Sequence, residues 1–221
     1  MLELTLERGR EGSPLSILAL GAHADDIEIG CGATILALAE SERPVRVTWV
    51  VLSASGDREA EAHASATSFL DGVEADIRLA SFRDAFFPHD SGVKEYFEGL
   101  KADVEPDLIL THARHDLHQD HRVVCELAWN TFRDHPVLEY EIPKYDGDLG
   151  APNVFSPVHE RHARRKTELL VEHFATQRDK HWFTEDLFQG LMRVRGMECR
   201  SPTGFAEAFY GRKLRLGVGL G

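Results

Sequence analysis

The sequence predicts an α/β fold in which helices cover both faces of a doubly wound, mostly parallel sheet. Short apolar or β-branched runs, such as residues 45–53 (VRVTWVVLS), alternate with segments of helical character. The spacing of these segments suits parallel β-α-β units, whose crossovers are nearly always right-handed. A chain of 221 residues can bury a full core in one domain, so we expect residues 1–221 to form a single domain.

The predicted elements can be placed in chain order. Four short apolar runs bounded by turn residues are predicted to be strands: residues 15–21, 45–53, 77–79 and 108–111. Five segments are expected to be helices: residues 31–40, 58–70, 94–102, 121–131 and 160–174. Residues 140–157, which are rich in Pro, Gly and Asp, are expected to form a long loop. The last five residues, GVGLG, are expected to be a loose tail.

Charge, apolar content and cysteine spacing exclude several classes of protein. The chain has 25 Lys and Arg against 37 Asp and Glu, and the net charge of −12 repels phosphate backbones and anionic lipids. The first fourteen residues lack the continuous apolar core of a signal peptide, and no other stretch approaches a membrane span. The three cysteines are widely separated, which disfavours a disulfide framework or a thiolate zinc site. We therefore expect a cytoplasmic protein without nucleic-acid partners or membrane insertion.

Two polar turns that follow predicted strands carry metal-ligand chemistry. One turn holds three such residues and the other six: His23, Asp25 and Asp26, then His112, His115, Asp116, His118, Asp120 and His121. In open α/β sheets, ligands bind in such loops beyond the carboxyl ends of the strands. A hydrolytic zinc site uses three His or carboxylate ligands and keeps a position for water. His and Asp from the first turn with one His from the second would supply that set.

The two adjacent aspartates of the first turn are expected to have different tasks. Neighbouring residues of a turn usually point in different directions, so one carboxylate can ligate a metal while the other acts as a base on water. Each motif also has a structural alternative: the aspartates could cap the following helix, and the second turn could be a solvated loop. Two such turns at corresponding strand ends favour a metal site. The glycines of GCGAT lack the third glycine of a dinucleotide-binding loop.

Residues 22–26 (AHADD) and 118–121 (HQDH) match two linked motifs, Ala-His-Pro-Asp-Asp and His-Pro-Asp-His. On these motifs the chain resembles the N-acetylglucosaminylphosphatidylinositol de-N-acetylase family, also called the PIG-L or LmbE-like deacetylases. The resemblance covers most of the chain through several further segments: residues 28–32, 58–61, 82–84, 165–166 and 173–177. Both motif prolines are replaced, by Ala24 and Gln119, which affects loop rigidity more than chemistry.

The resemblance implies a Rossmann-like, LmbE-like sheet and a zinc-dependent reaction. The reaction would be hydrolysis of an N-acetyl amide on an amino sugar or an amino-sugar conjugate. Carried over residue by residue, it implies that His23, Asp26 and His121 ligate one zinc per chain. Asp25 would be the general base that activates the metal-bound water.

The resemblance also implies roles for four other residues. His118 would stabilise the tetrahedral oxyanion, and Asp120 would orient an imidazole. Asp84 matches a position that binds sugar hydroxyls, and Arg58 is a candidate for contact with the substrate. For these last two, a turn-forming Asp and a surface Arg are the structural alternatives.

Two other functions stay open at this point. His-Asp pairs also build the two-metal sites of phosphohydrolases, which need more ligands. A sugar- or nucleotide-binding module without catalysis is the third reading, although it leaves Asp25 beside a ligand set unexplained. The expected partner is a small amino-sugar substrate whose aglycone the sequence leaves open, and a homo-oligomer would be common for such enzymes.

Overall fold

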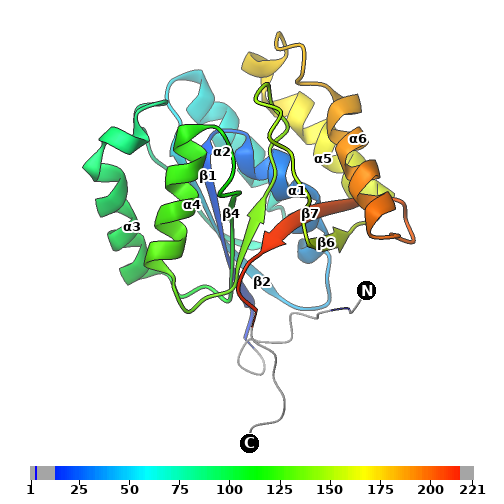
Figure 1. The fold of residues 1–221 in the computed structure, drawn as a ribbon, viewed down its shortest axis with the longest axis horizontal. Coiled ribbons are helices and arrows are strands. Elements are labelled where there is room, and N and C mark those ends of the chain that lie inside the picture. Colours follow the sequence, from blue (N-terminus) through cyan, green and yellow to red (C-terminus); the bar gives the residue numbers. More distant parts are fainter. Residues whose placement is uncertain (1–2, 4–12, 215–221) are drawn as a thin grey trace, which may run out of the picture.

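The computed structural model describes residue 3 and residues 13–214. They form a seven-stranded sheet with helices on both faces, and the strand order is β3-β2-β1-β4-β5-β7-β6 (Figure 1). The predicted doubly wound, mostly parallel fold is therefore confirmed. The predicted tail GVGLG and nearly all of the first fourteen residues lie outside the described residues, so a single domain over residues 1–221 stays a prediction.

Six of the seven strands run in the same direction, and β7 alone runs in the opposite sense. The strands are β1 (Leu15–His23), β2 (Val45–Ser53), β3 (Glu74–Leu79), β4 (Leu108–His112), β5 (Val137–Tyr140), β6 (Val154–Pro157) and β7 (Ala206–Gly211). Strands β1 to β5 pair in parallel, whereas β7 is antiparallel to both β5 and β6. β1 lies in the centre and pairs with β4, which brings the carboxyl ends of these two strands together.

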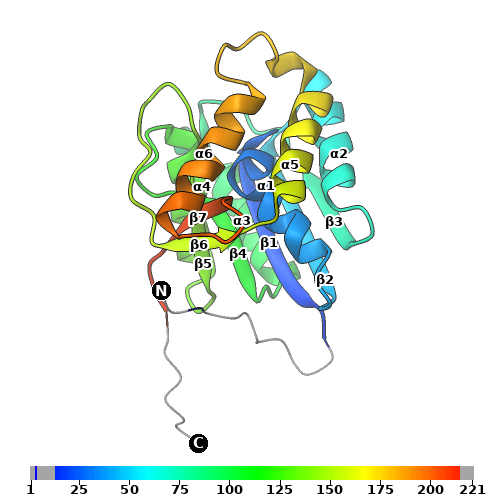
Figure 2. The same ribbon diagram turned by 90° about the vertical axis from the view of Figure 1, so that its right-hand side faces the viewer.

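Helices cover both faces of the sheet. They are α1 (Asp26–Ala39), α2 (Asp57–Phe69), α3 (Ser91–Asp103), α4 (Gln119–Thr131), α5 (Glu160–His173) and α6 (Glu185–Glu198), with short 3₁₀ turns at Phe87–His89 and Ala175–Gln177. Ile17 of β1 packs with residues of α1, α2, α5 and α6, which face the viewer in Figure 2. Leu18 packs on the opposite face with α3 and α4. Burial on both faces explains why the central strands are almost continuously apolar.

The sequence prediction missed one helix and three strands. It treated residues 140–157 as a loop, which is wrong at both ends, because β5 ends at Tyr140 and β6 occupies residues 154–157. β5 and β6 have only four residues each, too short for a periodic signal. β7 (AEAFYG) is poor in β-branched residues and forms through its pairing with β5 and β6. Among the described residues, no helix has the length and apolar character needed to cross a bilayer.

Helix α1 bends at Cys31, whose backbone angles of φ −146° and ψ 15° are not helical. A buried ion pair satisfies the backbone groups that the bend frees. The Lys166 ammonium donates to the carbonyl of Ile29 at 2.6 Å and lies 2.6 Å from Glu207. The Glu207 carboxylate accepts the amides of Ala33 and Thr34 at 3.0 and 2.7 Å. The bend sets the direction in which the first turn of α1 meets β1.

The glycines of the GCGAT segment allow α1 to approach the sheet and α2 closely. A Cβ on Gly30 would overlap the buried ring of Tyr140, and one on Gly32 would overlap Phe69. The Tyr140 hydroxyl in turn donates to the carbonyl of Leu20 at 2.6 Å, next to the predicted site. Gly30 therefore serves the packing of α1 on the sheet, and Gly32 serves its packing on α2.

Replacement of Gly30 by alanine is expected to lower the free energy of unfolding by about 1–3 kcal/mol, because the added methyl group overpacks the Tyr140 contact. Gly99→Ala in α3 is the matched control, since its added Cβ meets no described atom within 4 Å. That variant is expected to gain about 0.5–1 kcal/mol from the better helix propensity of alanine. Urea unfolding of both variants tests this, and equal effects would contradict the packing role of Gly30.

Candidate active site

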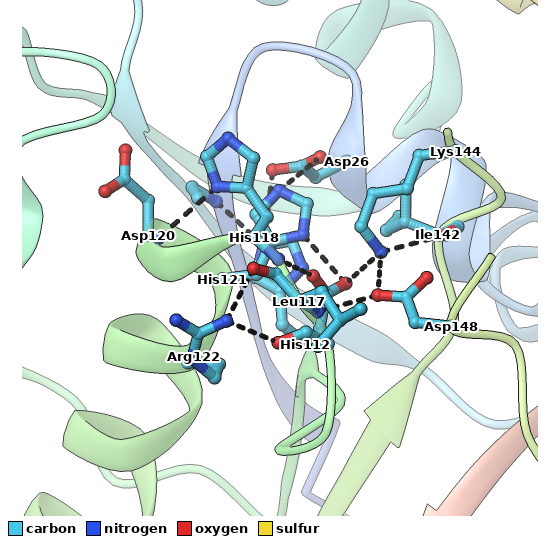
Figure 3. Close-up of polar contacts among 12 residues, drawn as sticks. Asp26, His112, Leu117, His118, Asp120, His121, Arg122, Ile142, Lys144 and Asp148 are labelled. Atoms are coloured by element: carbon cyan, nitrogen blue, oxygen red, sulfur yellow. Dashed lines mark hydrogen bonds and ion pairs between the residues drawn. The ribbon is translucent and has the colours of Figure 1, made fainter. Parts of the chain in front are cut away.

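The two polar turns meet at the carboxyl edge of the sheet. His23 is the last residue of β1, and Asp26 begins α1 three residues later. His112 is the last residue of β4, His118 precedes α4, and His121 lies in the first turn of α4. Because β1 and β4 are neighbouring parallel strands, these side chains converge in one cluster. Figure 3 shows Asp26, His112, His118 and His121 of this cluster. The residues that the sequence combined into one ligand set thus lie together.

Three side chains of this cluster present donor atoms at metal-ligand spacing. The Nδ1 atom of His23 lies 3.2 Å from Nε2 of His121 and 3.4 Å from Oδ2 of Asp26. Nε2 of His121 lies 3.5 Å from Oδ1 of Asp26. Zinc bonds of about 2.0–2.1 Å place two ligands of a tetrahedral site about 3.3–3.4 Å apart. The three side chains are therefore close enough to bind one ion, with His23 and His121 each near a different oxygen of Asp26.

Two other histidines lie beside this trio. The Nε2 atom of His112 accepts the backbone amide of Ala22 at 3.0 Å, so its lone pair is already engaged. The Nδ1 atom of His118 accepts the amide of Asp120 at 3.3 Å, and the His118 ring lies 4.8 Å from that of His23. Within the described part of the chain, every metal-competent trio of His, Cys, Asp or Glu includes His23 or His121. The set His23, Asp26 and His121 takes members from all three trios, two of which have no residue in common.

Asp25 occupies the position before α1 but does not act as a helix cap. Among the described residues its carboxylate makes no capping hydrogen bond, so the capping alternative is wrong for this residue. Its Oδ1 atom lies 3.1 Å from the Arg58 guanidinium. Burial raises the pKa of Asp25, although the charge of Arg58 partly offsets this effect. A buried carboxylate is thus held beside the trio without a structural task in the turn.

Arg58 lies at the site but is engaged by the protein. Besides Asp25, its guanidinium contacts Thr176 at 3.3 Å and Glu61 at 3.6 Å. The side chain is half-buried, so the alternative of a free surface arginine does not describe it. Contact between Arg58 and a substrate stays a prediction.

Asp84 and Asp120 lie on the far edge of the His23 ring. Oδ1 of Asp84 is 3.0 Å from Nε2 of His23, and the Asp84 side chain is 70% exposed. The buried Asp120 carboxylate accepts the amides of Ala85 and Phe87 at 2.6 and 3.2 Å, and lies 3.4 Å from Nε2 of His23. Asp120 therefore fixes the turn that carries Asp84. Sugar binding by Asp84 and imidazole orientation by Asp120 stay predictions.

The surroundings of His23 are strongly acidic. Burial alone would lower the pKa of His23, but hydrogen bonds with Asp120, Asp26 and Asp84 raise it well above its usual value. Several carboxylates thus converge on one imidazole in a partly buried site. Such an excess of negative charge favours a bound cation.

A carboxylate network of Asp116, Lys144 and Asp148, which had no role predicted from the sequence, lies behind His121. Oδ2 of Asp116 lies 2.9 Å from Nδ1 of His121 and 2.9 Å from the ammonium of Lys144, in the β5–β6 loop. Figure 3 shows Lys144 reaching from this loop towards Asp148, which pairs with it and accepts the amide of Leu117. Burial alone would raise the pKa of Asp116, but His121 and Lys144 hold it well below its usual range.

The network fixes the ring of His121. An acceptor at Nδ1 keeps the proton on that atom and leaves Nε2 free to face the centre. The signal for Asp116 was present in the sequence, five residues before His121 in the same turn. Lys144 had no such signal, because only the fold brings its loop to the site.

Replacement of Asp116 by alanine is expected to weaken metal binding at this cluster, measured with zinc, about 10- to 100-fold, because the His121 ring loses the partner that fixes its orientation. Asp103→Ala is the matched control, since Asp103 forms an exposed pair with Arg78 on the surface. Competition with a chromophoric chelator measures both affinities, after circular dichroism has shown intact folds. An unchanged affinity in Asp116→Ala would contradict the positioning role.

Comparisons with known proteins give the family. A sequence model of the GlcNAc-PI de-N-acetylase (PIG-L) family matches residues 18–132, which include both polar turns. The chain is also 32% identical over 168 residues to the uncharacterised deacetylase YaiS of Escherichia coli (strain K12). That match covers 71% of this chain and 89% of YaiS.

Solved structures share the fold at lower sequence identity. GalB, the 4-carboxy-2-hydroxymuconate hydratase of Pseudomonas putida, superposes with a TM-score of 0.73 at 17% identity, over 93% of this chain and 99% of its own. The N,N′-diacetylchitobiose deacetylase of Pyrococcus horikoshii gives 0.70 at 18%, over 88% and 82%. These structural similarities show the fold. The matches to the family's sequence model and to YaiS show the family to which the chain belongs. The chain is therefore a member of the GlcNAc-PI de-N-acetylase family of PIG-L or LmbE-like deacetylases.

Proposed function

We propose that the protein is a zinc-dependent deacetylase that hydrolyses the N-acetyl amide of an amino sugar or an amino-sugar conjugate. The observation that carries this proposal is the spacing of 3.2–3.5 Å among donor atoms of His23, Asp26 and His121, beside a separate buried carboxylate. Family membership supplies the reaction class. The name of the chitobiose deacetylase, a structural neighbour, supports an N-acetylated sugar as the substrate.

In this proposal, the residues of the site have separate roles in amide hydrolysis. Zinc held by His23, Asp26 and His121 would polarise the amide carbonyl and lower the pKa of a water to about 7. Asp25 takes the proton of the attacking water, and Arg58 holds this carboxylate in place from 3.1 Å. His118 donates a hydrogen bond to the oxygen that becomes negative. The proton on Asp25 then passes to the leaving nitrogen.

The competing functions have less support in this geometry. A two-metal phosphohydrolase needs two ligand sets, and two trios of the described residues have no member in common. One of them depends on His112, however, whose Nε2 atom already accepts the amide of Ala22. A binding module leaves Asp25 buried without a capping or ligand role. The fold alone does not select a deacetylase, because the hydratase GalB shares it.

The test is a screen for released acetate with zinc-loaded protein. The substrates are N-acetylglucosamine, its glycosides and acetyl-lysine peptides, with chelator-treated protein as the control. Acetate from the sugars that depends on zinc is the expected result. Release from the peptides with none from the sugars would overturn the substrate class, and hydrolysis of phosphate esters alone would overturn the reaction.

Replacement of His118 by alanine is expected to lower kcat about 100- to 1000-fold, the usual effect of removing one oxyanion donor. KM and zinc content should stay nearly unchanged, because the interaction forms mainly in the transition state. His115→Ala is the matched control, since this exposed histidine of the same turn packs on Tyr210. Loss of zinc from His118→Ala would instead make His118 a ligand.

A further inference from the structure

The exposed apolar side chains are not spread evenly over the surface. In the described residues, seven large hydrophobic side chains are exposed. Four of them lie in the loops that follow β3, β4 and β5 at the carboxyl edge of the sheet: Phe86, Leu117, Tyr145 and Leu149. Single exposed hydrophobic residues are normal, but a group around one site indicates an interaction surface.

Two of these residues are chain neighbours of groups in the site. Phe86 lies between Ala85 and Phe87, whose amides both donate to the Asp120 carboxylate. Leu117 separates Asp116 from His118 and is 57% exposed. Asp116 contacts His121 at 2.9 Å, so the exposed Leu117 side chain lies outside that contact. The Phe86 ring lies 3.6 Å from the Arg83 guanidinium and keeps 40% of its surface exposed.

The other two residues belong to the β5–β6 loop. Tyr145 follows Lys144 and Leu149 follows Asp148, the pair that connects this loop to Asp116. The Tyr145 ring is 69% exposed and lies 5.2 Å from the His181 ring. The β5–β6 loop thus meets the α5–α6 loop, and both project from the top of the molecule in Figure 1.

We propose that Phe86, Leu117, Tyr145 and Leu149 form an apolar rim that binds an alkyl or aryl aglycone on the amino-sugar substrate. The proposal rests on the proposed function, since a molecule whose acetamide reaches the centre must carry its remaining part across this rim. The floor of the site is acidic and suits polar groups, whereas the rim offers apolar contact area. The net charge of −12 disfavours an anionic lipid surface as the occupant.

The experiment compares the methyl and hexyl β-glycosides of N-acetylglucosamine. We expect wild-type protein to prefer the hexyl glycoside in kcat/KM by roughly tenfold or more, the effect of burying about two methylene groups. Leu117→Ser and Tyr145→Ser are expected to lose most of this preference. Met197→Ser and Val194→Ser, which change exposed apolar residues of α6, are the matched controls and should keep it.

Calorimetric binding of both glycosides separates a failure of the rim from a failure of the proposed function. Tighter binding of the hexyl glycoside without acetate release from any sugar would leave the rim supported and overturn the deacetylase proposal. Acetate release with equal binding of both glycosides would overturn the rim alone. A wild-type dimer that the Leu117→Ser/Tyr145→Ser double variant loses, with no glycoside preference, would assign the surface to a second copy and overturn the proposal.

Discussion

His121→Ala is expected to lose tightly bound zinc and, with it, essentially all deacetylase activity. The substitution removes one of three ligands and leaves the buried carboxylate of Asp116 without its imidazole partner at 2.9 Å. Two remaining protein ligands are fewer than the three that hold zinc in hydrolytic sites. Elemental analysis after dialysis should find about one zinc per wild-type chain, as for a mononuclear site, and almost none in the variant.

The control for this experiment is His63→Ala, which removes an exposed histidine of α2 outside the cluster. It should retain both zinc and activity. Two tightly bound ions in the wild type would contradict the mononuclear centre, and unchanged zinc content in His121→Ala would contradict the ligand role.

The second large effect is expected from Asp25→Asn, which should keep fold and zinc and lose turnover about 100- to 10,000-fold. An amide has nearly the same shape as the carboxylate and can stay beside Arg58, but it cannot take a proton from water. Asp26→Asn is expected to show the opposite pattern, with loss of zinc, because its two oxygens lie near His23 and His121. Parallel measurement of kcat and metal content distinguishes the two carboxylates.

Asp134→Asn, at an exposed position in the turn before β5, is the matched control for both changes. It should leave kcat and zinc content at the wild-type level. If Asp25→Asn lost the metal while Asp26→Asn kept it, the assignments of base and ligand would have to be exchanged.

The sequence predicted the parts of the fold whose physical cause is local. The run at residues 45–53 is buried on both faces, so its composition alone identifies β2 with correct bounds. β7 has no such pattern, because Glu207 is buried there only through its contacts with Lys166 and the amides of α1. A sequence window around Glu207 contains neither partner, so the strand could not be found.

The candidate site shows the same limit. The motif residues were found because they are close in sequence to the ends of two adjacent strands. Position in a motif could not tell which carboxylate supports which imidazole: Asp120 lies near His23, whereas Asp116 contacts His121. Lys144 is farther still from the motif, and only the pairing of β4 with β5 brings its loop to the site.

The contacts that satisfy the bend in α1 can form only late in synthesis, after the predicted ligands have been made. Every predicted ligand has been synthesised once residue 121 is added to the chain. The pair that satisfies the bend comes from α5 and β7, and Glu207 lies near the end of the described chain. A nascent or truncated chain that ends before Glu207 therefore contains the full ligand motif but lacks the group that caps the freed amides of Ala33 and Thr34.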